Sequence, residues 1–116
     1  ILDLLIIDKD KKLATVIDYK TGKSSQYADT RQLSLMGVGV FKHFPEVENI
    51  KSALMFLVSK ELIKEDYSVE KVDEMFEEWS RMTTRIDTAY QTEVFNAVPN
   101  FGCRWCPVVS CAHNGK

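Results

Sequence analysis

The 116-residue sequence lacks the features of a membrane protein or a secreted precursor. No apolar run approaches the roughly 20 residues that a transmembrane helix needs. The opening run at 1–7 has no basic leader and is interrupted by Asp3, so it does not match a signal peptide. Positive charge is not in excess either, because the formal net charge is −2. This balance disfavours proteins that hold nucleic acid by charge alone, but not enzymes whose bound divalent cation supplies the positive charge.

Cysteine is scarce and unevenly distributed. The sequence has three cysteines, and all of them lie in its last fourteen residues. An odd, tightly spaced set is a poor framework for disulfides. It favours a reducing compartment and a metal site.

The sequence also lacks an initiator methionine and a polar lead-in. It starts directly with an apolar, strand-like run, so we expect further residues upstream.

The hydrophobic pattern predicts a mixed α/β domain. We expect strands at 2–8, 13–20 and 50–59, helices at 28–44 and 68–90, a turn or edge strand at 61–67, and an irregular segment at 96–116. The segment 50–59 is almost wholly apolar at its centre, which predicts a strand buried on both faces.

The first two strands should form a hairpin, because the polar residues Lys9–Lys12 alone separate them. That loop pairs Asp8 with Leu13, and the same register places Asp3 opposite Asp18. Facing side chains in an antiparallel pair have Cβ atoms about 5 Å apart, so two carboxylates there repel each other. A divalent cation between them would remove this repulsion.

Asp18 and Lys20 share one face of their strand, since side chains alternate along a strand. A carboxylate there can bind a hard cation, and a lysine can stabilise charge that develops on a phosphate. Lys23 and Arg31 flank this group as candidate phosphate contacts. The alternative is an ordinary hairpin with a surface aspartate and lysine, although Asp3 and Asp18 both lie in apolar surroundings where a charge is costly.

Three segments together resemble one nuclease family. Asp3, the sequence VIDYKTGK at 16–23 and the sequence QLSLM at 32–36 are similar to the motifs of the RecB-like branch of the PD-(D/E)XK superfamily. In that branch the helix motif is Gln-x-x-x-Tyr. This chain has Met36 at the tyrosine position, which puts part of the helix contact in doubt.

The resemblance implies a role for each matching residue. Asp3, Asp18 and the backbone carbonyl of Tyr19 would bind the metal, and Lys20 would be the catalytic lysine. Gln32 would contact DNA or the active site. The family also has an upstream helix with a metal-binding His or Glu, for which this sequence has no equivalent.

The resemblance further implies a restriction-endonuclease-like mixed sheet flanked by helices, with the N-terminal part of the domain missing. Residues 1–98 would form the nuclease core and 99–116 a Cys-rich tail. The activity would be a Mg²⁺- or Mn²⁺-dependent deoxyribonuclease, an exonuclease of recombination or repair. Its partners would be DNA and other recombination or replication proteins, in a bacterial cytoplasm or a phage-infected host.

The tail has the spacing of a metal site, because Cys103 and Cys106 form a C-x2-C unit and Cys111 follows closely. His113 could complete a four-ligand zinc site. Some RecB-like nucleases end in three such cysteines that help to hold a [4Fe–4S] cluster, and the resemblance favours that cofactor. A third interpretation is three free cysteines packed as small apolar side chains.

Two other functional classes remain open. One is a catalytically inactive module that binds DNA or a protein. The other is an interaction domain stabilised by zinc or an iron–sulfur site, in which the paired carboxylates have no catalytic role.

Overall fold

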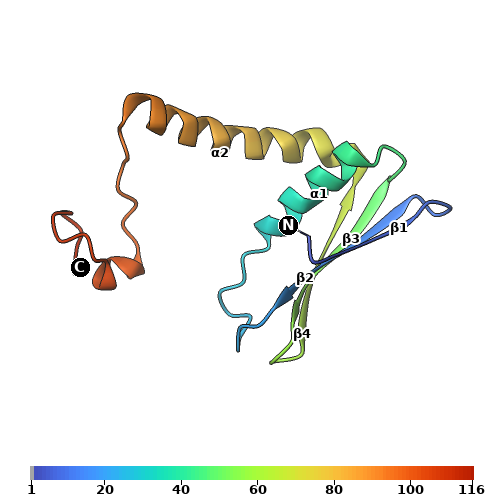
Figure 1. Ribbon diagram of the computed structural model, residues 1–116, viewed down its shortest axis with the longest axis horizontal. Helices are drawn as coiled ribbons and strands as arrows, with labels where there is room; N and C mark the ends of the chain where they lie inside the picture. The colour runs from blue at the N-terminus through green and yellow to red at the C-terminus, as the bar shows by residue number, and fades with distance from the viewer. Residues whose placement is uncertain (1) are drawn as a thin grey trace. The chain divides into compact units, whose positions relative to one another are not determined.

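The computed structural model describes residues 2–116 and contains one mixed sheet and two main helices (Figure 1). The elements are β1 (Leu4–Asp8), β2 (Leu13–Lys20), α1 (Arg31–His43), β3 (Asn49–Phe56), β4 (Glu61–Ser68), a short 3-10 helix (Val69–Lys71), α2 (Val72–Thr92) and a second 3-10 helix (Phe101–Trp105). The strand order is β1-β2-β3-β4. β2 and β3 are parallel, and both outer pairs are antiparallel.

The chain divides into two compact units, Ile1–Thr83 and Thr84–Lys116. The first contains the sheet, α1 and the first half of α2. The second contains the end of α2 and the Cys-rich segment. The predicted functional division between residues 1–98 and 99–116 remains a prediction.

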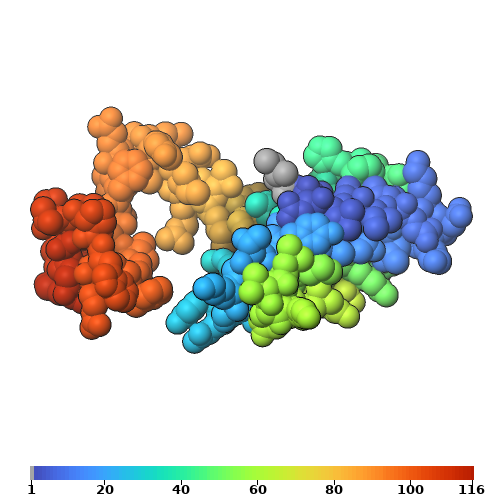
Figure 2. Space-filling model, turned by 60° about the horizontal axis from the view of Figure 1, so that its bottom comes forward, coloured from blue at the N-terminus to red at the C-terminus, as the bar shows by residue number. Residues whose placement is uncertain are grey.

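The predicted α/β fold class is confirmed, and so is the hairpin register, because Asp8 pairs with Leu13. The segment 61–67, predicted as a turn or an edge strand, belongs to β4, which lies at an edge of the sheet. β3 ends at Phe56, earlier than predicted, because a turn at 57–60 follows in which Lys60 has a φ of 58°. In the space-filling view this yellow-green turn lies beside the light-blue loop at 21–30 (Figure 2).

α1 begins three residues later than predicted, at Arg31. The reason lies in the preceding turn, where the Asp29 carboxylate accepts the backbone N–H of Arg31 at 3.0 Å. An aspartate that bonds two residues ahead stabilises a turn in place of helix. The Ala28 N–H completes this turn by donating to the carbonyl of Ser25 at 2.9 Å.

The core lies between α1 and one face of the sheet. Ala14 and Val16 alternate along β2 and are both fully buried. They pack with Val40 and Phe41 of α1 in the first core cluster. A second cluster follows towards the end of β3, and it consists of Leu33, Leu54 and Phe56. Because Asp18 and Lys20 continue the alternation of Ala14 and Val16, the core side of β2 passes from apolar side chains to a carboxylate and then an ammonium.

The apolar stripe predicted along α2 is only partly buried, which corrects the sequence-based expectation of core packing. Met75 is the one buried residue of this helix, whereas Phe76 is 48% exposed. Trp79 is half-buried and donates to Ser34 Oγ at 3.3 Å, so α2 contacts α1 along its first turns. None of the helices described in residues 2–116 is long and apolar enough to cross a bilayer.

The two glycines of α1 should respond differently to substitution by alanine. Gly39→Ala should stabilise the protein by about 0.5–1 kcal/mol, because alanine loses less backbone entropy in a helix. A Cβ at residue 39 meets no atom within 4 Å. A Cβ at Gly37 would lie 3.3 Å from side-chain atoms of Met75 and Tyr67. Urea denaturation should therefore show a smaller gain, or a loss, for Gly37→Ala, and a larger gain at residue 37 than at 39 would contradict this packing.

Candidate active site

The candidate site lies at the C-terminal end of β2, on the face that α1 covers. Asp18 is only 7% exposed. Its strand partner on β3 is Leu54, and that of Lys20 is Phe56, so the second core cluster forms an apolar wall beside both residues. A low-dielectric wall strengthens electrostatic interactions at the site.

Lys20 is held between a carboxylate and an amide. Its Nζ lies 2.6 Å from Asp18 Oδ2 and donates to Gln32 Oε1 at 2.9 Å. The contact with Asp18 is an ion pair without hydrogen-bond geometry, because the buried Oδ2 accepts no hydrogen bond from any described residue. An ionised oxygen in this position is costly, and a cation is the partner that its chemistry favours.

Asp3 approaches the same end of β2 from outside the sheet. Strand pairing begins at Leu4, so Asp3 lies one residue before the ladder. Its Oδ2 accepts the backbone N–H of Tyr19 at 2.8 Å. This bond holds the exposed Asp3 carboxylate against the backbone of Tyr19, the residue that follows Asp18. The arrangement agrees with the predicted register as far as the paired residues extend.

Gln32 reaches Lys20 from the first turn of α1. Its Nε2 donates to the carbonyl of Asp29 at 3.0 Å, while its Oε1 accepts from Lys20. An amide has one donor end and one acceptor end, so the Asp29 carbonyl orients the acceptor towards Lys20. The sequence pattern identified Gln32 but not the role of Asp29, which depends on the local turn.

The charge of Arg31 is compensated within the same turn. Its Nε and Nη2 donate to both carboxylate oxygens of Asp29, with Nη2 at 2.6 Å from Oδ2. The Arg31 guanidinium lowers the pKa of Asp29 to about 2. Arg31 is therefore a weaker candidate for phosphate binding than its sequence position suggests. Lys23, in contrast, makes no ion pair with any residue in 2–116.

The donor set fits a hard divalent cation of the Mg²⁺ class. Within residues 2–116 no group of three or more His, Cys, Asp or Glu side chains is placed to hold a metal. Mg²⁺ keeps several waters and is commonly bound by one or two carboxylates together with substrate phosphate. Asp3 and Asp18 supply two carboxylates, and the buried Asp18 Oδ2 has no hydrogen-bond donor.

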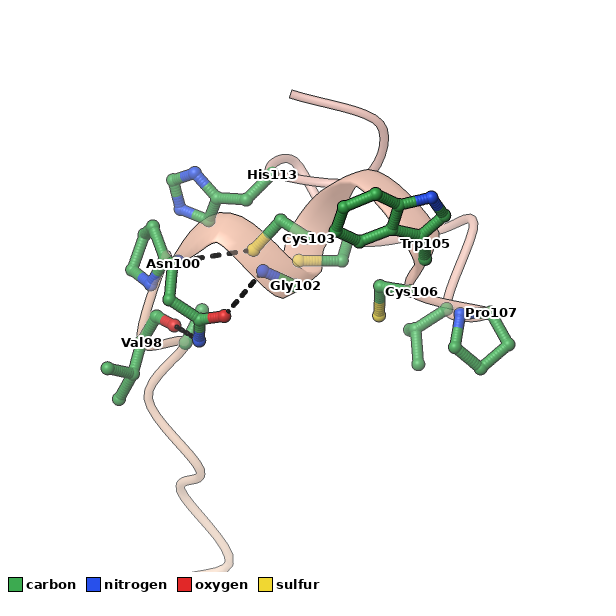
Figure 3. Close-up of a pocket in the computed structure, with 12 residues that line it drawn as sticks. Val98, Asn100, Gly102, Cys103, Trp105, Cys106, Pro107 and His113 are labelled. Carbon is green, nitrogen blue, oxygen red and sulfur yellow. Dashed lines mark hydrogen bonds between the residues drawn. The ribbon is translucent and has the colours of Figure 1, made fainter. Parts of the chain in front are cut away.

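The Cys-rich segment surrounds a pocket of about 540 Å³, which Cys103, Cys106, Cys111 and His113 help to line (Figure 3). The three cysteines are half-buried and free of disulfides. Asn100 stabilises the local turn, because its side-chain oxygen accepts the N–H of Gly102 at 2.8 Å.

The pocket offers part of a metal-binding donor set. Cys103 Sγ accepts the backbone N–H of Asn100 at 3.4 Å, and the Cys106 carbonyl accepts from Asn114 Nδ2 at 2.6 Å. Thiols are ligands of thiophilic metals and of [4Fe–4S] clusters. Among residues 2–116, however, no three Cys, His, Asp or Glu side chains are grouped to hold a metal, so the three thiols line one pocket without forming a metal site there. Neither cofactor is established by this arrangement.

The family model of the PD-(D/E)XK nuclease superfamily matches residues 1–111. The chain belongs to this superfamily. No curated protein and no solved structure gave a match. Membership confirms the predicted superfamily and agrees with a restriction-endonuclease-like arrangement of the mixed sheet and helices. It supports a nuclease, and PD-(D/E)XK nucleases typically use Mg²⁺ or Mn²⁺. The RecB-like branch and the individual site residues remain predictions.

Lys20→Met should lower the free energy of unfolding by about 1–3 kcal/mol without metal, because Asp18 then keeps a buried charge with no cation beside it. Mg²⁺ or Mn²⁺ should raise the Tm of this variant in thermal denaturation. The matched control is Asp18→Asn/Lys20→Met, which should gain no such increase. Equal metal-induced shifts in the two variants would contradict a cation site at Asp18.

Proposed function

We propose that this PD-(D/E)XK protein hydrolyses DNA phosphodiester bonds with Mg²⁺ or Mn²⁺, at a site formed by Asp3, Asp18 and Lys20. The main support is the buried Asp18 carboxylate, whose Oδ2 lacks a hydrogen bond and lies 2.6 Å from a lysine ammonium. Exonuclease action in recombination or repair is proposed on the sequence resemblance alone.

Asp3 and Asp18 would hold the divalent cation, and the backbone carbonyl of Tyr19 is the third proposed ligand. When bound, the cation supplies a Lewis acid for the phosphate and lowers the pKa of a water. Asp18 also attracts Lys20 through its charge, and this attraction keeps the ammonium at the end of β2. Asp3 is fixed for the same task by its bond from the Tyr19 N–H.

The role proposed for Lys20 is to stabilise negative charge on the reacting phosphate or to hold the attacking water. Stabilisation of this kind is effective when the charged group is positioned before the reaction. Asp18 and Gln32 provide that positioning through contacts of 2.6 and 2.9 Å with the ammonium. Gln32 is thus proposed to act on Lys20 directly, and the sequence resemblance implies a contact with DNA for the same side chain.

The Cys-rich segment is proposed to hold a structural [4Fe–4S] cluster through Cys103, Cys106 and Cys111. The support is the shared pocket, the three thiol donors and the sequence resemblance. Zinc bound by the cysteines and His113 is the alternative. Either centre would stabilise the second unit, because metal-binding energy adds to folding energy.

Lys20→Ala should reduce cleavage of linear single- or double-stranded DNA by about 100-fold or more, because it removes a preorganised charge from the site. The assay measures product formation with Mg²⁺ or Mn²⁺, and EDTA should abolish it. The matched control is Lys51→Ala, which removes an exposed lysine of β3 and should retain activity. If the folded wild-type protein cleaves no DNA with either ion, the enzymatic proposal fails and a binding module becomes the better account.

Anaerobic reconstitution with iron and sulfide should give broad visible absorption that Cys106→Ser weakens, because one thiolate ligand is lost. Elemental analysis distinguishes the alternatives, since His113→Ala should reduce bound zinc but leave bound iron unchanged. A protein that takes up neither metal would contradict both proposals and leave the cysteines as free thiols.

A further inference from the structure

One carboxylate connects the β3–β4 turn to the loop that precedes α1. Glu61 Oε2 accepts a hydrogen bond from Ser59 Oγ at 2.8 Å and another from the backbone N–H of Ser25 at 3.2 Å. Glu61 and Ser25 are 36 residues apart in sequence. The turn and the loop lie side by side on the molecular surface (Figure 2). The bond from Ser59 directs the carboxylate, so the acceptor for Ser25 is preorganised.

The same turn also holds the start of the loop. The backbone N–H of Leu57 donates to the carbonyl of Lys20 at 2.9 Å. The segment 21–25 is therefore fixed at both ends by residues 57–61. Lys23 lies in the middle of this segment and is exposed. The Lys23 backbone is thus held three residues after Lys20, and its exposed side chain makes no ion pair within residues 2–116.

Beyond Ser25 the contacts continue to Lys20. The Ser25 carbonyl accepts from the Ala28 N–H at 2.9 Å, and Ala28 packs against the second core cluster. The next residue is Asp29, whose carbonyl orients Gln32. Gln32 in turn accepts from Lys20 Nζ. The loop at 21–30 thus contacts Glu61 of β4 through Ser25 and reaches the site through Asp29 and Gln32.

We propose that Glu61 is a positioning residue that fixes segment 21–25, so that the Lys23 ammonium binds a DNA phosphate next to the scissile one. The inference rests on the proposed nuclease function. Lysine binds phosphate as a point charge, so its contribution depends on where its backbone is held. Fixing the loop before binding reduces the entropy lost when substrate arrives. The hydrogen bond from Ser59, and then that from Ser25, lower the pKa of Glu61, because both bonds stabilise the charged carboxylate.

The first test measures how readily the loop opens to a protease, which does not depend on nuclease activity. Trypsin should cleave after Lys23 about two to ten times faster in Glu61→Ala than in the wild-type protein, the range over which one hydrogen bond changes a local opening equilibrium. Cleavage in the Lys9–Lys12 turn serves as the internal reference and should not change. The matched control is Glu65→Ala, an exposed glutamate of the same strand that forms no hydrogen bond or ion pair through its side chain within residues 2–116.

The second test measures how the loop affects the KM and kcat of DNA cleavage. Glu61→Ala should raise the KM for DNA several-fold while kcat changes little, because only the phosphate contact is displaced. Lys23→Ala should raise KM likewise. In the double variant Glu61→Ala should add nothing further, since the two residues act on one contact. Glu61→Gln keeps an oxygen acceptor and should recover part of the wild-type KM.

The outcomes separate this proposal from the proposed function. Unchanged proteolysis after Lys23 in Glu61→Ala would overturn the positioning role whether or not the protein cleaves DNA. Faster proteolysis with an unchanged KM would show that the loop is held but not for substrate, which also overturns it. Independent, additive effects of the two variants on KM would contradict a shared contact. Absence of cleavage in the wild-type protein would instead count against the proposed function.

Discussion

The site depends on one electrostatic constraint, which is the Asp18 carboxylate at the buried end of β2. A carboxylate on the core face of a central strand is costly unless positive charge and hydrogen bonds surround it. Lys20 supplies charge at 2.6 Å, yet the Asp18 Oδ2 receives no hydrogen bond within the part of the chain that the structure describes. A buried carboxylate oxygen without a hydrogen bond is a suitable ligand for a hard cation, and this links the packing of the sheet to the metal-dependent chemistry proposed for this superfamily member.

Much of the fold could be predicted from local patterns. The four-residue polar loop determined the hairpin register, and the alternation along 13–20 placed Asp18 and Lys20 on one face. Local turns moved the predicted end of β3 and start of α1, and the burial predicted for α2 was wrong because it depends on contacts distant in sequence. The stripe along α2 has helical periodicity, but only Met75 of this helix is buried. Phe76 is 48% exposed, and what it meets on α1 is the Lys42 ammonium, 5.0 Å from its ring centroid. Periodicity shows which face is apolar, but it does not show how much of that face finds a partner.

The residue types of the candidate site could be predicted from the sequence, but the hydrogen bonds that hold them in place could not. The Asp-x-Lys pattern and the resemblance identified Asp18, Lys20 and Gln32, and the structure brings these three into contact. The roles of Asp29 and Glu61 could not be predicted, because one acts through a backbone carbonyl and the other across 36 residues. In the tail the C-x2-C spacing indicated a shared site, and the cysteines do line one pocket. The identity of the metal depends on ligand number and geometry, which spacing alone does not determine.

The central claim is that Asp3 and Asp18 bind one divalent cation together. Anomalous diffraction from crystals soaked in Mn²⁺ tests it most directly, because the signal locates the metal without relying on activity. The account predicts one strong peak about 2.0–2.6 Å from an oxygen of each carboxylate, a distance suited to hard cations with oxygen ligands. A fully occupied peak bound to only one of them, or Mn²⁺ bound only elsewhere on the protein, would contradict it.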